Sequence, residues 1–274
     1  MKGPLYFASG SSRAADIRGF SAIGHAIGVA AQEVSPASEA ELVRLAGTGL
    51  QVFVDSGAFS EVAFSDKGVT VVKPITHADW QKRLALYLRL ATVLGEQVYL
   101  VAPDRIGDQE ETLRRLTRYA PELRVLRWLG ARILVPIQKG TKTQAAFVRD
   151  VIAALGFDDF VHAIPAKKRA TTLDEMRAYV REVRPRAIHF LGLGIRNTSA
   201  PAVLALCNEL IPDAAVSCDS NMIAANVGRG RGLRPLSAAQ DKARRMIARG
   251  ATSITSVQEL GIILAFGPQM GRAA

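Results

Sequence analysis

The stretch LQVFVDSGAF, residues 50–59, decides the fold of this 274-residue chain. It begins as a short, continuous apolar run and turns abruptly polar at Asp55, Ser56 and Gly57. Continuous apolar strands are typical of parallel sheets that are covered on their outer face. The stretch therefore predicts a buried parallel strand whose carboxyl end carries polar side chains.

The same pattern recurs along the chain. Clear apolar runs lie at 97–102, 132–137, 159–164, 187–192 and 214–218. The segment PLYFAS at 4–9 is predicted to be a further strand. The segment AIGVAA at 26–31 is a weaker candidate that could belong to a helix. Eight strands of this kind fit a closed (β/α)8 barrel of the TIM type. An open, doubly wound sheet is the alternative.

Amphipathic segments separate these strands, as βαβ units require. The predicted helices span 38–47, 78–94, 109–129, 142–155, 171–184, 199–210 and 237–249. Ser38 with Glu41, and Thr172 with Glu175, have the spacing of helix capping boxes. Because no linker or repeat interrupts the pattern, residues 1–274 are predicted to form one catalytic barrel domain.

The composition limits the class of protein. Thirty-five basic residues against 25 acidic ones give a formal charge of +10, which indicates a polyanionic partner such as nucleic acid. No apolar run approaches the roughly 20 residues that cross a bilayer, and no signal peptide is recognised, so a cytoplasmic location is expected. Two cysteines and four scattered histidines show no metal-ligand spacing, so neither a metal nor another cofactor is expected.

Polar residues follow the strands at positions where barrel enzymes carry their chemistry. Carboxylates stand at three strand ends, Asp55, Asp104 and Asp219, and Gln138 adds an amide at a fourth. One carboxylate can attack an electron-poor carbon while a second moves protons on the leaving group. Two carboxylates are also the recurring solution for breaking a glycosidic bond.

Basic residues follow several of the same strand ends. The candidates for nucleic-acid contact are Lys139, Lys167, Lys168, Arg169, Arg196, Arg229 and Arg231. A positive rim of this kind attracts phosphates and steers a polyanion toward the acidic face.

Five strand-end segments, taken in order, resemble the strand-end motifs of the tRNA-guanine transglycosylases. These segments are DSGAF, PD, PIQKG, FLGLG and CDSN. The resemblance implies a (β/α)8 barrel that exchanges guanine for a 7-deazaguanine base. Asp219 would be the nucleophile that forms a covalent glycosyl-aspartate intermediate, and Asp55 the general acid/base. The resemblance also implies a set of substrate-binding residues: Ser56, Phe59, Asp104, Gln138, Leu191 and Gly192.

This chain departs from the family in two respects. The Gly-rich loop that usually follows the sixth strand is replaced by Ile164, Pro165, Ala166 and Lys167, and the zinc site is missing. The family usually binds zinc through three cysteines and a histidine, and this chain has no such cluster. A chain without zinc resembles the branch that inserts 7-deazaguanines into DNA, so DNA is favoured over tRNA as the nucleic-acid partner. A homodimer or a helper protein is a further possibility. Two other readings stay open: a non-catalytic nucleic-acid-binding barrel subunit, and a barrel enzyme acting on a small phosphorylated metabolite.

Overall fold

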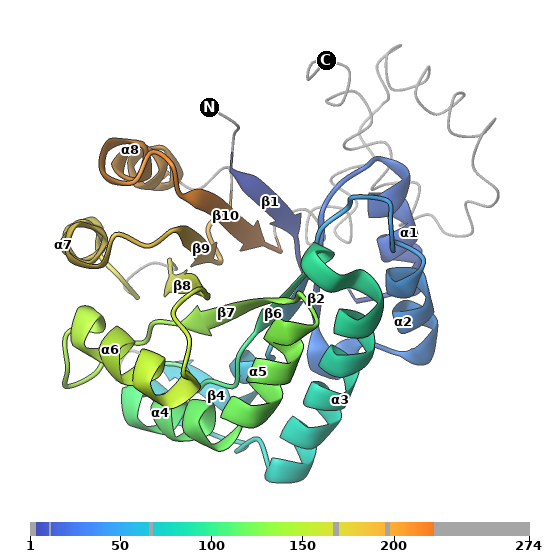
Figure 1. Ribbon diagram of the computed structural model, residues 1–274, viewed down its shortest axis with the longest axis horizontal. Helices are drawn as coiled ribbons and strands as arrows, with labels where there is room; N and C mark the ends of the chain where they lie inside the picture. Colours follow the sequence, from blue (N-terminus) through green and yellow to red (C-terminus); the bar gives the residue numbers. More distant parts are fainter. Residues whose placement is uncertain (1–3, 11, 66–67, 167–169, 195–197, 222–274) are drawn as a thin grey trace.

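A closed barrel of eight parallel strands forms the centre of the molecule, with helices around its outside (Figure 1). The computed structural model describes residues 4–10, 12–65, 68–166, 170–194 and 198–221. The strands follow one another around the barrel in the order β1-β10-β9-β8-β7-β6-β3-β2. Their bounds are β1 Leu5–Ala8, β2 Ile27–Ala30, β3 Val52–Asp55, β6 Val98–Val101, β7 Arg132–Pro136, β8 Val161–Pro165, β9 Ala187–Leu191 and β10 Ala215–Ser220. All eight predicted strands and the predicted fold are confirmed.

Helices connect these strands along the outside of the barrel. They are α1 Ala14–Ala22, α2 Pro36–Val43, α3 His77–Leu94, α4 Gln109–Arg118, α5 Ala120–Trp128, α6 Gln144–Leu155, α7 Leu173–Val183 and α8 Ala200–Leu210, with short 3-10 turns at η1 Ala31–Glu33, η2 Ala58–Glu61 and η3 Gly95–Gln97. The predicted helix at 237–249 lies outside the described residues, so the prediction of one domain over 1–274 stays a prediction.

Three local predictions need correction. Helix α1 was not predicted. The single helix expected over 109–129 is two helices that meet at Tyr119, because Pro121 in the first turn of α5 has no N–H and cannot continue a preceding helix. Ser35, and not Ser38, caps α2, since Pro36 is suited to the first helical position. The capping box at Thr172 and Glu175 is confirmed.

Alternate residues of each strand point to opposite sides, so the barrel has two cores. The larger core lies between strands and helices. The smaller one fills the interior, where the rings of Phe7, Phe53 and Tyr99 pack with centroids 5.2–5.5 Å apart. The imidazole of His189 stacks on Phe53 at 4.9 Å. These rings close the barrel below its carboxyl end and form the floor of any site there.

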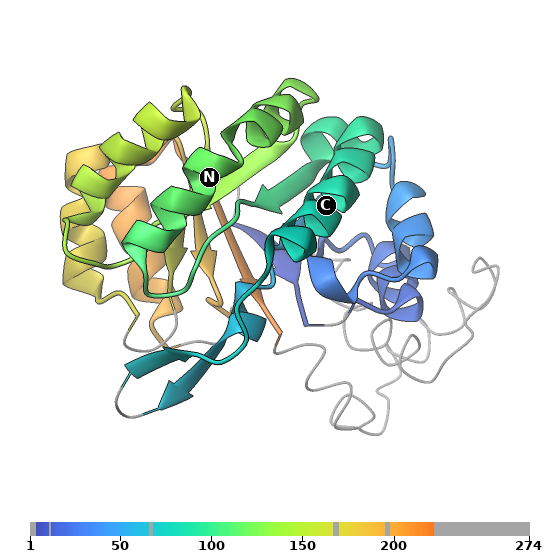
Figure 2. The same ribbon diagram turned by 90° about the horizontal axis from the view of Figure 1, so that it is seen from below.

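A two-stranded antiparallel hairpin follows β3 and was not predicted. It consists of β4 Val62–Ser65 and β5 Gly68–Val71, and Figure 2 shows it projecting from one end of the barrel. Gly57 makes the turn into this segment with φ of 74°, and a Cβ there would lie 1.8 Å from the side-chain oxygen of Gln32. Glycine is therefore the residue that fits this turn.

Within the described ranges, no helix combines the length and apolar character that a bilayer crossing requires. In the same part of the chain, His, Cys, Asp and Glu side chains form no group of three suited to a metal ion.

Candidate active site

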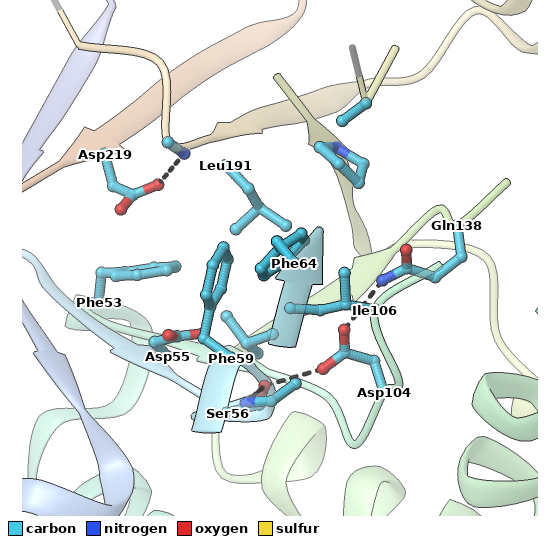
Figure 3. Close-up of a pocket in the computed structure, with 15 residues that line it drawn as sticks. Phe53, Asp55, Ser56, Phe59, Phe64, Asp104, Ile106, Gln138, Leu191 and Asp219 are labelled. Atoms are coloured by element: carbon cyan, nitrogen blue, oxygen red, sulfur yellow. Dashed lines mark hydrogen bonds between the residues drawn. The ribbon is translucent and has the colours of Figure 1, made fainter. Parts of the chain in front are cut away.

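A cavity of about 150 Å³ opens at the carboxyl end of the barrel, beneath the hairpin (Figure 3). An apolar cavity of this size holds roughly one six-membered ring. The residues that line it are Phe53, Asp55, Ser56, Ala58, Phe59, Phe64, Val101, Asp104, Ile106, Gln138, Pro165, Ala170, Leu191, Gly192 and Asp219. The structure thus brings together every residue predicted for catalysis or substrate binding.

Asp104 and Gln138 form a hydrogen-bonded pair at one end of the cavity (Figure 3). The amide nitrogen of Gln138 donates to Asp104 Oδ2 at 3.0 Å, and the hydroxyl of Ser56 donates to Oδ1 at 2.8 Å. The backbone N–H of Gly107 donates to the amide oxygen of Gln138 and so fixes which way that amide faces. Burial raises the pKa of Asp104 to about 6, although both hydrogen bonds oppose this shift.

A buried cluster of charged side chains contacts the backbone of Asp104 and supports this pair. The guanidinium of Arg115 donates to both carboxylate oxygens of Glu61, at 2.9 and 2.7 Å, and to the backbone oxygen of Asp104. Arg105 adds a third bond to Glu61, at 2.9 Å. Burial acts to raise the pKa of Glu61, but the hydrogen bonds from the two arginines outweigh it and hold the pKa below its ordinary value.

Glu61 also anchors the hairpin. Its backbone oxygen accepts from Val72 and Lys73, and its side chain accepts from the backbone N–H of Ile75. One buried carboxylate therefore ties the hairpin to helix α4 and, through Arg115, to the Asp104 loop.

Asp219 and Asp55 lie at the other end of the cavity, at the ends of β10 and β3 (Figure 3). Both have the parity of the inward-facing residues on their strands. The backbone N–H of Gly192 donates to Asp219 Oδ1 at 2.7 Å, and the imidazole Nε2 of His189 lies 3.3 Å from the same oxygen. The site thus offers two carboxylates at one end of a small cavity, a suitable arrangement for proton transfer or nucleophilic attack.

The walls between these ends are apolar. Phe59 contacts Phe64 of the hairpin with ring centroids 5.2 Å apart, and Leu191 and Ile106 complete the lining. Phe59 and Phe64 are 45% and 55% exposed, so an entering molecule can remove both rings from water. Sequence reasoning missed Phe64, Ile106 and the Glu61–Arg115 pair, since none of them directly follows a barrel strand.

The predicted basic rim receives little support. Lys139 forms an ion pair with Glu175 at 2.7 Å, so its charge is partly neutralised. The remaining candidates, Lys167, Lys168, Arg169, Arg196, Arg229 and Arg231, lie outside the described residues.

Comparison with known proteins gives no family. No family model matches the chain, and no curated protein does. Two similar solved structures are of D-allulose 3-epimerase from Methylomonas sp.. The first, in complex with D-allulose, is 12% identical with a TM-score of 0.46 and covers 98% of both chains. The second, with additional C-terminal residues, is 11% identical with a TM-score of 0.47 and covers 98% of this chain and 99% of that one. A likeness at this level concerns the barrel fold and carries nothing about the substrate.

The comparisons do not bear out the resemblance to the tRNA-guanine transglycosylases: no model of that or any other family matches the chain, and the similar solved structures carry a different name. The predicted guanine exchange, the 7-deazaguanine base and the DNA or tRNA partner are therefore wrong. The physical reason is that the five motifs are short strand-end segments, and barrels of this type collect polar residues at strand ends whatever their reaction. The order of such motifs follows from the fold as readily as from a shared activity.

Proposed function

We propose that this protein is a barrel enzyme that catalyses a proton-transfer reaction on a small cyclic metabolite. The observation that carries the proposal is the division of the cavity into two polar ends with apolar walls between them. At one end, Asp55 and Asp219 supply two carboxylates. At the other, Asp104 and Gln138 supply a fixed hydrogen-bonding edge.

The size and walls of the cavity argue for the ring. A cavity of about 150 Å³ accommodates one ring. The aromatic faces of Phe59 and Phe64 and the side chain of Leu191 can cover the two faces of such a ring. The ring edge toward Asp104 would carry N–H or O–H groups, since an ionised carboxylate only accepts hydrogen bonds.

Asp55 and Asp219 divide the chemistry between them. One carboxylate removes a proton from the bound ring, and the other, in its protonated form, returns one to a second position. General acid–base catalysis by positioned side chains contributes roughly 10²–10⁴-fold to a rate. We therefore expect Asp55→Asn and Asp219→Asn each to lower turnover by about that factor.

The experiment has two stages. First, a panel of small sugars, sugar phosphates and nitrogen heterocycles is screened for binding by ligand-observed NMR, with phosphorylated and unphosphorylated forms of each compound compared. Compounds that bind are then incubated with the protein in D₂O, and mass spectrometry follows deuterium incorporation and isomer formation.

Asp213→Asn is the matched control. Asp213 is exposed and lies before the first residue of β10, at the opposite end of the strand from Asp219. The proposal predicts that this variant exchanges deuterium like the wild type, whereas exchange is slower by roughly 10²–10⁴-fold in Asp55→Asn and Asp219→Asn. Exchange at the wild-type rate in either cavity variant would contradict the proposed roles.

A further inference from the structure

We propose that His189 and Ser217 are positioning residues that form a hydrogen-bonded relay below the cavity, fix Asp219 Oδ1 and leave Oδ2 as its reactive oxygen. The inference deepens the proposed function, because it rests on Asp219 being a reacting carboxylate. It assigns a task to two buried residues that the sequence pattern alone assigns to the barrel packing.

The three side chains lie in adjacent strands. Ser217 pairs with His189 in the register between β10 and β9, and Asp219 lies two residues further along β10, on the same inward-facing side. His189 Nδ1 is 2.9 Å from Ser217 Oγ, and His189 Nε2 is 3.3 Å from Asp219 Oδ1. The imidazole is fully buried and Ser217 is 4% exposed, so water does not compete for the contact between these two side chains.

The ring is held in place by packing. His189 stacks on Phe53 with an interplanar angle of 13°, and Phe7 lies against it with centroids 6.0 Å apart. Ala163, its pairing partner on β8, is apolar. Ser217 and Asp219 are thus the polar side chains within hydrogen-bonding distance of the imidazole in the described part of the barrel.

Donor and acceptor logic selects one tautomer. Asp219 Oδ1 already accepts from the backbone N–H of Gly192, so it faces His189 as an acceptor. If Nδ1 of a neutral His189 carried the proton, Nε2 and Oδ1 would face each other as two acceptors. Of the two neutral tautomers, the one without this conflict has the Ser217 hydroxyl donating to Nδ1 and Nε2–H donating to Asp219.

The hydrogen bonds to Asp219 Oδ1 have a consequence at the cavity. Oδ1 accepts two N–H groups, from Gly192 and His189, whereas no described residue donates to Oδ2. Oδ2 therefore keeps its lone pairs for the bound molecule. The hydroxyl of Ser217 has a second acceptor, the backbone oxygen of Ile188, but at 3.4 Å this contact is the weaker one.

The tautomer of His189 is measurable without a substrate. The chain has four histidines, so a protein labelled with ¹⁵N-histidine gives few ring signals in a long-range ¹H–¹⁵N correlation spectrum. We expect His189 to carry a proton on Nε2 and none on Nδ1, and we expect Asp219→Asn to shift the His189 signals while those of His25, His77 and His162 stay in place.

Ser217→Thr and Ser217→Val form a matched pair. The two substitutions add nearly the same volume, but only threonine keeps the hydroxyl that donates to Nδ1. We expect the Thr variant to keep the Nε2–H tautomer and the Val variant to lose it, with protonated Nδ1 becoming populated. A wild-type His189 protonated on Nδ1, or equal spectra of the Thr and Val variants, would overturn the relay.

These outcomes are independent of the proposed reaction. If the tautomer pattern is as expected but Asp219→Asn leaves deuterium exchange intact, the relay stands and the proposed function fails. If exchange requires Asp219 but His189 carries its proton on Nδ1, the function stands and the relay fails.

Discussion

The side-chain amide of Gln138 donates a 3.0 Å hydrogen bond to the carboxylate of Asp104 across 34 positions of the sequence. The two residues follow neighbouring strands, β7 and β6, and meet because parallel strands end at the same edge of the barrel. Burial raises the pKa of Asp104 to about 6, so this carboxyl changes charge in a range where stability is easily measured.

Replacing Asp104 should change how stability depends on pH. The folded-state pKa of about 6 lies above the ordinary value of 3.8, so the folded protein binds this proton more tightly. The contribution of Asp104 to stability therefore falls as pH rises from about 4 to about 6, by about 3 kcal/mol. In urea unfolding, the free energy of unfolding of Asp104→Asn relative to that of the wild type should therefore rise by about 3 kcal/mol between about pH 4 and pH 7. A constant difference at all pH values would show that the pKa is not raised.

The contribution of His162 to stability should change with pH in the opposite direction. Its ring nitrogen hydrogen-bonds with the hydroxyl of Tyr179, and burial lowers its pKa from 6.5 to about 4. The unfolded chain takes up this proton first, so stability is lost as pH falls from about 6.5 to about 4, by about 3 kcal/mol. His162→Gln should remove that acid sensitivity, and in wild-type unfolding curves the slopes from His162 and Asp104 should largely offset each other.

The ion pair behind the site should matter for stability. Arg115→Met leaves the fully buried carboxylate of Glu61 without its main partner, and breaking a buried pair in this way costs roughly 3–5 kcal/mol. Arg114→Met is the control on the same helix. The Arg114 side chain is 62% exposed, and its pair with Glu111 should contribute less than about 1 kcal/mol. Equal losses in the two variants would argue against a structural role for the cluster.

The hairpin should contribute to binding more than to folding. Phe64 is 55% exposed, so Phe64→Ala should change the free energy of unfolding by no more than about 0.5 kcal/mol. It should weaken binding of a cavity ligand about twofold to twelvefold, because an aromatic contact contributes about 0.5–1.5 kcal/mol. Trp128→Ala, at a residue that is 82% exposed on α5, should leave affinity unchanged in calorimetric titrations. Unaltered affinity in Phe64→Ala would separate the hairpin from the site.

The barrel and the convergence of its strand ends were predictable because they depend on short-range patterns. Runs such as LQVFV mark buried strands locally, and the parallel topology then brings Asp55, Asp104 and Asp219 to one edge. The hairpin was not predictable in the same way, since four of its valine and phenylalanine side chains remain exposed in spite of their apolar character: Phe64, Val69, Val71 and the flanking Val72.

The relay around His189 depended on information that periodicity does not contain. Alternation places His189 inside the barrel, but its contact with Ser217 and Asp219 depends on the register between β9 and β10. The functional resemblance failed for a related reason. Short strand-end motifs report the architecture that all barrels of this type share, and they do not report which molecule the cavity binds.

The pairing of β1 with β10 places Phe7 beside Asp219 and so joins the first described strand to the last. The carboxylate we assign to the reaction therefore reaches its place only when two strands separated by more than 200 residues dock edge to edge. During synthesis, every other wall of the cavity emerges from the ribosome before the strand that carries Asp219. Closure of the ring of strands and completion of the cavity are therefore one event.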